Sequence, residues 1–212
     1  MRFIFIASLL AVGLAVAAQP AHAKGVRMFV RHDVTDYPAW RKVYDSFKPT
    51  QKKLGVTAQA VYRSIDNPND ITVIHDFATL EAAKAMVASP ELKAAMETSG
   101  VAGAPTIWFT TPTGARSAEA NGVRMYVRHE VADYAAWRKT YDAFDVTRKK
   151  MGVTAQAVYR SADNPNDITV THDFKTAEAA KAFAASPELK AAMEQAGVTN
   201  APQIWFTNRA AK

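Results

Sequence analysis

The sequence predicts an α+β protein built from two copies of one unit. Residues 26–110 recur as residues 123–207 at a constant offset of 97 residues, and 65 of the 86 aligned pairs from Gly25/Gly122 onward are identical. Two copies are too few for a solenoid, whose repeats bury their cores only in longer stacks. They indicate a pseudo-twofold assembly, within one chain, of the kind that separate copies form as a homodimer.

Each copy begins with a strand and an amphipathic helix. Residues 26–34 alternate with period two, which predicts a strand. Asp36 is placed to cap the helix that follows. Aromatic residues then recur at three- and four-residue steps, a stripe typical of a helix face that packs on a core; they are Tyr37, Trp40, Tyr44 and Phe47. We expect Pro49 to end or kink this helix, and Val146 in its place to let the second copy's helix run further.

The rest of the unit completes the order strand, helix, strand, strand, helix, strand. Residues 56–63 and 71–77 predict two strands, joined by an Asp-Asn-Pro-Asn-Asp turn that lacks the length and glycine of a calcium loop. Residues 79–88 predict a helix, and Ser89-Pro90-Glu91 restarts one that ends near Gly100. Residues 105–109 predict the last strand. This order is that of a split βαβ, ferredoxin-like unit.

The first 23 residues have the pattern of a signal peptide. Arg2 precedes an apolar stretch that ends at Ala18, and Ala21-His22-Ala23 is the small–any–small pattern that signal peptidase reads. The stretch is short for a membrane span, although an uncleaved anchor is the alternative. We therefore expect a periplasmic or secreted protein with a signal peptide at 1–23, units at 24–110 and 122–212, and a linker at 111–121.

Composition excludes several kinds of site. The chain has no cysteine, which excludes disulfides, thiolate metal sites and a cysteine nucleophile. Its net charge of +6 is spread over both units, which suits a small anionic ligand better than nucleic acid. The sequence contains no nucleophile elbow, phosphate loop, zincin motif or dinucleotide fingerprint. We expect no nucleic-acid partner, no membrane partner after cleavage, no cofactor and no metal.

Three segments of each copy resemble the dimeric α/β-barrel superfamily, which includes the antibiotic-biosynthesis-monooxygenase-like (ABM-like) proteins. They read DYPAW from Asp36, IHDF up to Phe77 and EAAKAMVASPELKAAM from Glu81, and the second copy reads DYAAW, THDF and EAAKAFAASPELKAAM. The resemblance covers nearly all of both units. It implies that two four-stranded sheets pack face to face into a barrel within one chain, with helices outside and a ligand cavity between the sheets or in each half.

The sheet face opposite the aromatic helix is the expected barrel interior. It carries Arg27, which we expect to pair with Asp76 across two antiparallel strands. Arg31 and Arg63 have no evident acid on that face except Asp33, and a guanidinium suits a carboxylate or enolate oxygen; the alternative is that they only solvate a wet lumen. The predicted ligand-binding residues are Arg31, Gln59, Arg63, Tyr126, Arg128, Gln156 and Arg160.

Four histidines offer an alternative site for a metal ion or haem: His32, His75, His129 and His172. Antiparallel pairing is expected to separate His32 from His75 by three residues, about 10 Å at strand rise. Two ligands of one ion each lie about 2 Å from the metal, so this spacing disfavours a shared ion. Both side chains also share the helix-facing side, where a core histidine is the usual outcome.

These observations predict an exported barrel that binds a small anionic or phenolic molecule. Relatives of this fold include cofactor-free oxygenases, haem enzymes, isomerases, polyketide cyclases and proteins without known activity, so the fold does not fix the function. An enzymatic form would be a cofactor-independent monooxygenase or cyclase-like enzyme acting on a phenolic or carboxylate compound, its catalytic residues unassigned. The alternatives are a non-catalytic binding or structural barrel and a haem- or metal-handling protein. A higher oligomer of the barrel stays open.

Overall fold

The structure is a computed structural model that describes residues 25–114 and 122–211. The first unit comprises β1 (Val26–Val34), α1 (Tyr37–Lys53), β2 (Ala58–Ser64), β3 (Asp70–Phe77), α2 (Leu80–Val87), α3 (Pro90–Thr98) and β4 (Val101–Pro112). The predicted order of elements is therefore confirmed. The predicted signal peptide lies outside the described residues, as does most of the linker, and β4 extends two residues into the linker's predicted start.

The second unit repeats this order with one difference. It comprises β5 (Val123–Glu130), α4 (Tyr134–Ala143), α5 (Asp145–Lys150), β6 (Ala155–Ser161), β7 (Asp167–Phe174), α6 (Ala177–Ala184), α7 (Pro187–Gln195) and β8 (Gln203–Arg209). Within the described residues, no helix is long and apolar enough to cross a membrane.

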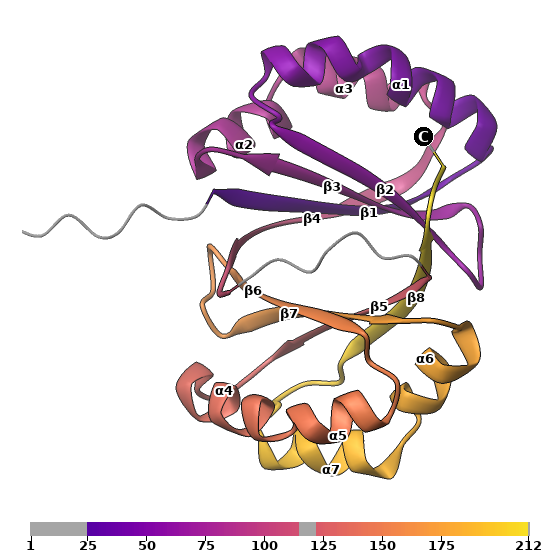
Figure 1. The fold of residues 1–212 in the computed structure, drawn as a ribbon. Coiled ribbons are helices and arrows are strands. Elements are labelled where there is room, and N and C mark those ends of the chain that lie inside the picture. The colour runs from indigo at the N-terminus through magenta and orange to yellow at the C-terminus, as the bar shows by residue number, and fades with distance from the viewer. Residues whose placement is uncertain (1–24, 115–121, 212) are drawn as a thin grey trace, which may run out of the picture.

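The eight strands form one closed antiparallel barrel in the order β1-β3-β2-β8-β5-β7-β6-β4. Each half has the ferredoxin-like order, in which its last strand flanks its first strand. Closure comes from two pairings between the copies, β2 with β8 and β4 with β6. Figure 1 shows the two sheets facing each other and the helices on the two outer sides. The prediction of a barrel formed within one chain is confirmed.

The aromatic face of α1 packs against the sheet, as its spacing predicted. The Asp36 carboxylate caps the helix by accepting a hydrogen bond from the Ala39 amide at 2.7 Å. Trp40 and Tyr44 are buried and lie in one apolar cluster with Val26, Met28 and Val30 of β1. Trp137 is buried in the equivalent cluster of the second half. These contacts confirm which face of β1 the helices cover.

Pro49 does not end the first helix, and Val146 does not let the second copy's helix run further, so both of these predictions were wrong; the predicted kink stays a prediction. Helix α1 runs through Pro49 to Lys53, whereas the second copy, with Val146 at that position, is divided at Phe144 into α4 and α5. The division follows Tyr141, whose carbonyl oxygen accepts a hydrogen bond from the side chain of Arg148. The first copy has Gln51 at the position of Arg148, so the side chain that competes for the backbone carbonyl there is missing.

Aromatic side chains of both copies fill the barrel interior. The Phe29 ring stacks on Trp108 with 5.1 Å between ring centroids, and Tyr126 stacks on Trp205 at 4.9 Å. The two tryptophans donate hydrogen bonds across the barrel, each at 3.0 Å, to Thr169 and Thr72 of the other copy. The centre of the lumen is thus an aromatic core shared by the two copies.

This shared core predicts that one copy alone dimerises. A chain of residues 24–116 would expose the lumen aromatics and the edges of β2 and β4, and two such chains can bury both by forming the barrel between them. Analytical ultracentrifugation should show a dimer. On dilution the two chains should dissociate and lose their circular dichroism signal together. A folded monomer of this fragment, with native circular dichroism, would refute an obligatory two-copy barrel.

Candidate functional site

Each half contains a cavity on the helix-facing side of its sheet. The first cavity, of about 60 Å³, lies between β1 and β3 of the sheet and the helices α1, α2 and α3. The second, of about 40 Å³, lies at the equivalent place in the other half. Both are lined almost wholly by apolar and aromatic side chains. Enclosed space therefore lies beside the histidines, and a further cavity of about 90 Å³ lies at the lumen side beside Arg27 and Arg124. Those two arginines are bonded to aspartates, so the apolar histidine cavities, with their unbonded nitrogens, are the candidate sites.

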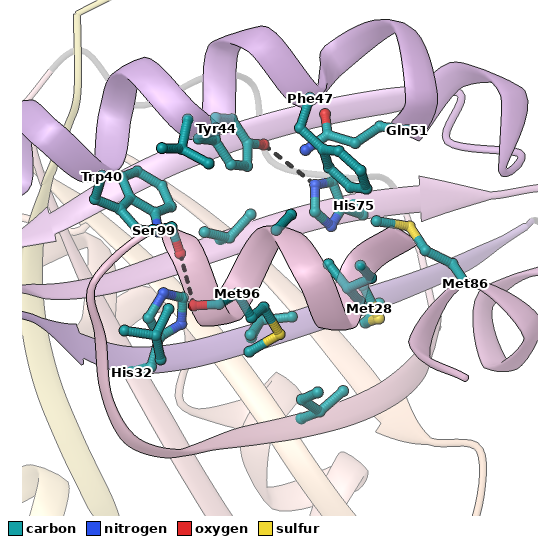
Figure 2. A pocket seen from close by; sticks show the side chains of 17 residues that line it. Met28, His32, Trp40, Tyr44, Phe47, Gln51, His75, Met86, Met96 and Ser99 are labelled. Atoms are coloured by element: carbon teal, nitrogen blue, oxygen red, sulfur yellow. Dashed lines mark hydrogen bonds between the residues drawn. The ribbon is translucent and has the colours of Figure 1, made fainter. Parts of the chain in front are cut away.

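Tyr44 and Gln59 fix the orientation of His75 in the first cavity. The Tyr44 hydroxyl donates to Gln59 Oε1 at 2.6 Å and lies 3.1 Å from His75 Nε2, a contact drawn in Figure 2. Because the single hydroxyl proton goes to Gln59, the Tyr44 oxygen accepts from His75 Nε2–H. His75 Nδ1 then carries a lone pair, and this buried atom has no partner among the described residues.

Two further polar side chains of this cavity have buried atoms without hydrogen-bond partners. Both ring nitrogens of His32 and the Oε1 atom of Gln51 are buried and unbonded in the part of the chain that the structure describes. Such an atom costs about 1–3 kcal/mol when it is left without a hydrogen bond. Three unpartnered polar groups on one apolar cavity indicate a site that is completed by a bound molecule.

Burial holds these histidines neutral. It lowers the pKa of His32 to about 4 and that of His75 to about 4, against the weaker opposing effects of Asp70 and Asp76 respectively. Burial also lowers the pKa of His172 to about 3, with the positive charge of Arg148 adding to the effect. At neutral pH each imidazole is thus a hydrogen-bond acceptor without charge. The first cavity contains no charged group to attract a carboxylate.

The predicted arginines of β1 and β5 are paired. Arg31 forms a salt bridge of 2.6 Å with Asp70, and Arg128 forms one of 2.6 Å with Asp167. The prediction that they lacked an acid was wrong, because the first residue of β3 lies opposite Asp33 in the register and so reaches the Arg31 side chain. Each guanidinium also covers a lumen tryptophan, within 4.7 Å of the ring centroid. Their part in ligand binding stays a prediction.

The face predicted for β2 was wrong by one residue. The register pairs Gln59 with His75 and Arg63 with Ile71, so both point to the helices, and Ala60 and Tyr62 point into the lumen. A shift of one residue exchanges the two faces of a strand. The alternation of polar and apolar residues predicted the wrong face because polar side chains of β2 face the helices. Arg63 covers the Tyr37 ring at 3.8 Å, and Arg160 covers Tyr134 equally in the second copy.

Three other predicted positions have definite surroundings. Gln156, like Gln59, faces the helices and contacts the cavity tyrosine, Tyr141, at 3.2 Å. Tyr126 is on the lumen side as predicted, buried in the aromatic core. The ion pair of Arg27 with Asp76 is confirmed at 2.7 Å, and Arg27 also donates to Tyr159 of the other copy at 2.7 Å.

The register also places the histidines farther apart than expected. His75 lies opposite Met28, so it is four residues from His32 along the sheet, about 13 Å at strand rise. Figure 2 shows the two rings toward different ends of the pocket. Within residues 25–114 and 122–211, no three His, Cys, Asp or Glu side chains gather closely enough to hold a metal ion. The geometry disfavours a shared metal ion.

Gln51 and Tyr44 belong to the site, and the sequence interpretation did not select them. Tyr44 was assigned only to the core-packing stripe. Gln51 follows Phe47 by four residues and so continues that stripe with a polar side chain. A polar residue at a core-facing helical position was the available signal.

Residues 121–195 match the family model for antibiotic biosynthesis monooxygenase. The second unit matches this family model over most of its length, and the chain as a whole has the dimeric α/β-barrel fold. The near-identical first unit repeats that fold in the other half of the barrel. No curated protein sequence matches this chain.

Solved structures share the whole barrel. An anthrone oxidase-like protein matches with a TM-score of 0.64 and 11% identity, over 89% of this chain and 92% of that one. A candidate monooxygenase from Fusobacterium nucleatum matches with a TM-score of 0.60 and 8% identity, over 89% and 94%. A candidate monooxygenase from Lactobacillus acidophilus matches with a TM-score of 0.55 and 16% identity, over 87% and 93%. At these identities the likeness to these structures is one of fold.

The buried histidines predict a loss of stability in mild acid. Their pKa values are lower in the folded state than the ordinary value of 6.5, so the unfolded chain binds more protons. Stability is then complete above about pH 6.5 and falls as the pH drops toward 4, by about 3 kcal/mol for each histidine. Urea unfolding at a series of pH values from 7.5 to about 4.5 measures this decrease in the free energy of unfolding.

A matched variant tests the cause. The His32→Phe/His129→Phe protein should show a shallower dependence of unfolding free energy on pH over the same range. An unchanged slope would assign the acid sensitivity to other groups.

Proposed function

We propose that this protein is a cofactor-independent monooxygenase that binds a small hydroxy-aromatic molecule in the cavity of its first half. The observation that carries the proposal is the unpartnered Nδ1 of His75, held in an apolar cavity by the Tyr44–Gln59 hydrogen bond. A phenolic hydroxyl can donate to this nitrogen, and the aromatic ring can pack on Trp40 and Phe47, which line the same cavity.

The electrostatics favour a phenol over a carboxylate. A carboxylate in this cavity would meet neutral imidazoles and apolar carbon, and an ion without a partner is costly to bury. An uncharged phenol loses little free energy on transfer from water into the cavity. Its hydroxyl donates a hydrogen bond to a nitrogen that otherwise has no partner. The phenolic half of the sequence-based prediction therefore has the stronger support, and its carboxylate half has none in this cavity.

The arrangement fits a reaction in which the substrate supplies the electrons. Transfer of the phenolic proton to His75 Nδ1 would leave an electron-rich phenolate that can reduce O₂. One oxygen atom enters the ring and the other leaves as water. With 1-naphthol the balance is C10H8O + O₂ → C10H6O2 + H2O, which gives 1,4-naphthoquinone and requires no external reductant. The match to a monooxygenase family supports this class of reaction.

The size of the cavity requires adjustment around a ring. An apolar cavity of about 150 Å³ holds benzene, and the first cavity measures about 60 Å³. Met28, Met86 and Met96 line it, and unbranched methionine side chains repack readily around a ligand. Helix α3 has no fully buried residue and covers the cavity loosely. A monocyclic phenol therefore needs only side-chain movement, and 1-naphthol needs α3 to move as well.

A purely binding role is the second candidate. It is favoured by the pKa of His75, which burial lowers to about 4 and which makes the imidazole a weak proton acceptor. Catalytic turnover of 1-naphthol distinguishes an enzyme from a binding protein. Haem handling has less support, because a cavity of this size is smaller than a macrocycle and His75 Nε2 is engaged by Tyr44. A Soret band in purified protein would favour it. We also propose export, to be checked by mass spectrometry for a mature chain that begins at Lys24.

Phenol binding and 1-naphthol oxidation test the proposal. Phenol should raise the melting temperature, and 1-naphthol should consume O₂ in step with quinone absorbance. His75→Phe keeps the ring and removes Nδ1, so phenol should bind about tenfold more weakly, the equivalent of one hydrogen bond, and oxidation should cease.

The control is Arg31→Ala/Arg128→Ala, which should keep both activities. Binding without O₂ uptake would identify a binding protein without catalysis. Loss of phenol binding in the arginine variant, with His75→Phe unaffected, would move the site to the end of the lumen.

A further inference from the structure

We infer that the two halves of the barrel are not equivalent: the first binds the ligand, and Arg148 closes the corresponding cavity of the second. This inference rests on the proposed function for the location of the ligand. Arg148 thereby sets the number of working sites per chain to one.

The two cavities differ at a few aligned positions, and one of these differences introduces a charge. The histidines, the cavity tyrosine and its glutamine partner are the same in both copies. The residue aligned with Gln51 is Arg148, and both line their cavities. Gln51 leaves a buried oxygen atom without a partner, whereas Arg148 is fully buried and bonded.

Each of the three nitrogens of the Arg148 guanidinium donates a hydrogen bond. It donates to Gln156 Oε1 at 2.6 Å, to the Tyr141 carbonyl oxygen and to Asp145 Oδ1 at 3.2 Å. Its guanidinium lies over the Tyr141 ring, 3.8 Å from the centroid. It therefore covers the aromatic ring and the amide that, in the first half, belong to the ligand site.

A second substitution accompanies the arginine. Asp145 takes the place of Lys48 and accepts hydrogen bonds from both Arg148 and Gln156. A buried cation without a counter-charge is strongly destabilising, so this carboxylate makes the arginine tolerable. The two changes form one unit, which we name the Arg148–Asp145 plug.

The second cavity differs from the first in several ways beside the plug, and Phe183, which replaces Met86, also packs against His172 there. The cavity is smaller, about 40 Å³ against 60 Å³. The Tyr141 hydroxyl lies 3.4 Å from His172 and 3.2 Å from Gln156, compared with 3.1 Å and 2.6 Å in the first half, because Gln156 now also accepts from Arg148. Leu189 of α7 is buried, whereas the equivalent Leu92 of α3 is partly exposed. The second half is thus the tighter one.

Reciprocal exchange of the plug provides the test, in the full mature chain. Arg148→Gln/Asp145→Lys restores the first copy's residues in the second half, and Gln51→Arg/Lys48→Asp imports the plug into the first. The chain is labelled with 5-fluorotryptophan, and the ¹⁹F signals of Trp40 and Trp137, which line the two cavities, are assigned with Trp→Phe variants. Phenol and xenon are the probes, since xenon enters apolar cavities regardless of hydroxyl chemistry.

In the unaltered protein both probes should shift the Trp40 signal and leave Trp137 in place. Removal of the plug should add a Trp137 shift and raise phenol stoichiometry from one to two per chain. Import of the plug should weaken the Trp40 response at least tenfold. Lys150→Gln, an exposed residue at the end of the same helix, is the control and should behave as the unaltered chain. If the chain with the imported plug does not fold, the response of the plug-removal variant alone tests the inference.

Several outcomes overturn the inference: equal shifts of both signals in the unaltered protein, a shift of Trp137 alone, no shift with xenon, or a silent Trp137 after plug removal. A shift of the Trp40 signal with xenon but not with phenol would support the inference about the plug and would refute the proposed phenol-binding function.

Discussion

The aromatic core shared by the two copies is the interaction on which the rest of the structure depends. Phe29, Trp108, Tyr126 and Trp205 come from both copies and pack together in the lumen. Their burial gives the apolar inner faces of the two sheets a common interior, and the strand pairs β2–β8 and β4–β6 close the barrel around it. This core occupies the centre of the lumen, and the apolar cavities lie on the opposite face of each sheet.

The lumen also decides what its arginines do. Arg27 and Arg124 each pair with an aspartate of their own copy and donate to a tyrosine of the other copy. A charge taken out of water requires such partners, and removing one would leave an uncompensated ion. These cations therefore tie the two copies together. Arg31 and Arg128 also link the copies, at the lumen end. Each bonds an aspartate of its own copy and covers a tryptophan of the other copy.

Both helix-facing cavities contain buried histidine nitrogens that are unbonded within the described residues, in surroundings that are otherwise largely apolar. Polar groups in a stable fold are normally satisfied. We infer that a ligand completes those of the first cavity, whereas in the second the plug occupies the adjoining space. Duplication within one chain then frees the two halves to differ: a linked pair can keep one site and convert the other into packing, which a homodimer of identical chains cannot do. Arg148 and Gln51 mark that difference.

The sequence by itself determined the repeat, the order of elements, the core-facing side of β1 and α1, and the pairing of Arg27 with Asp76, because all of these follow from periodicity and local spacing. Only the tertiary structure decided the face of β2, since Gln59 and Arg63 are polar residues that face helices and thereby reverse the usual alternation. It also decided that Asp70 reaches Arg31 and that His75 borders a cavity rather than a filled core, because both depend on register and on how side chains from several elements fill space.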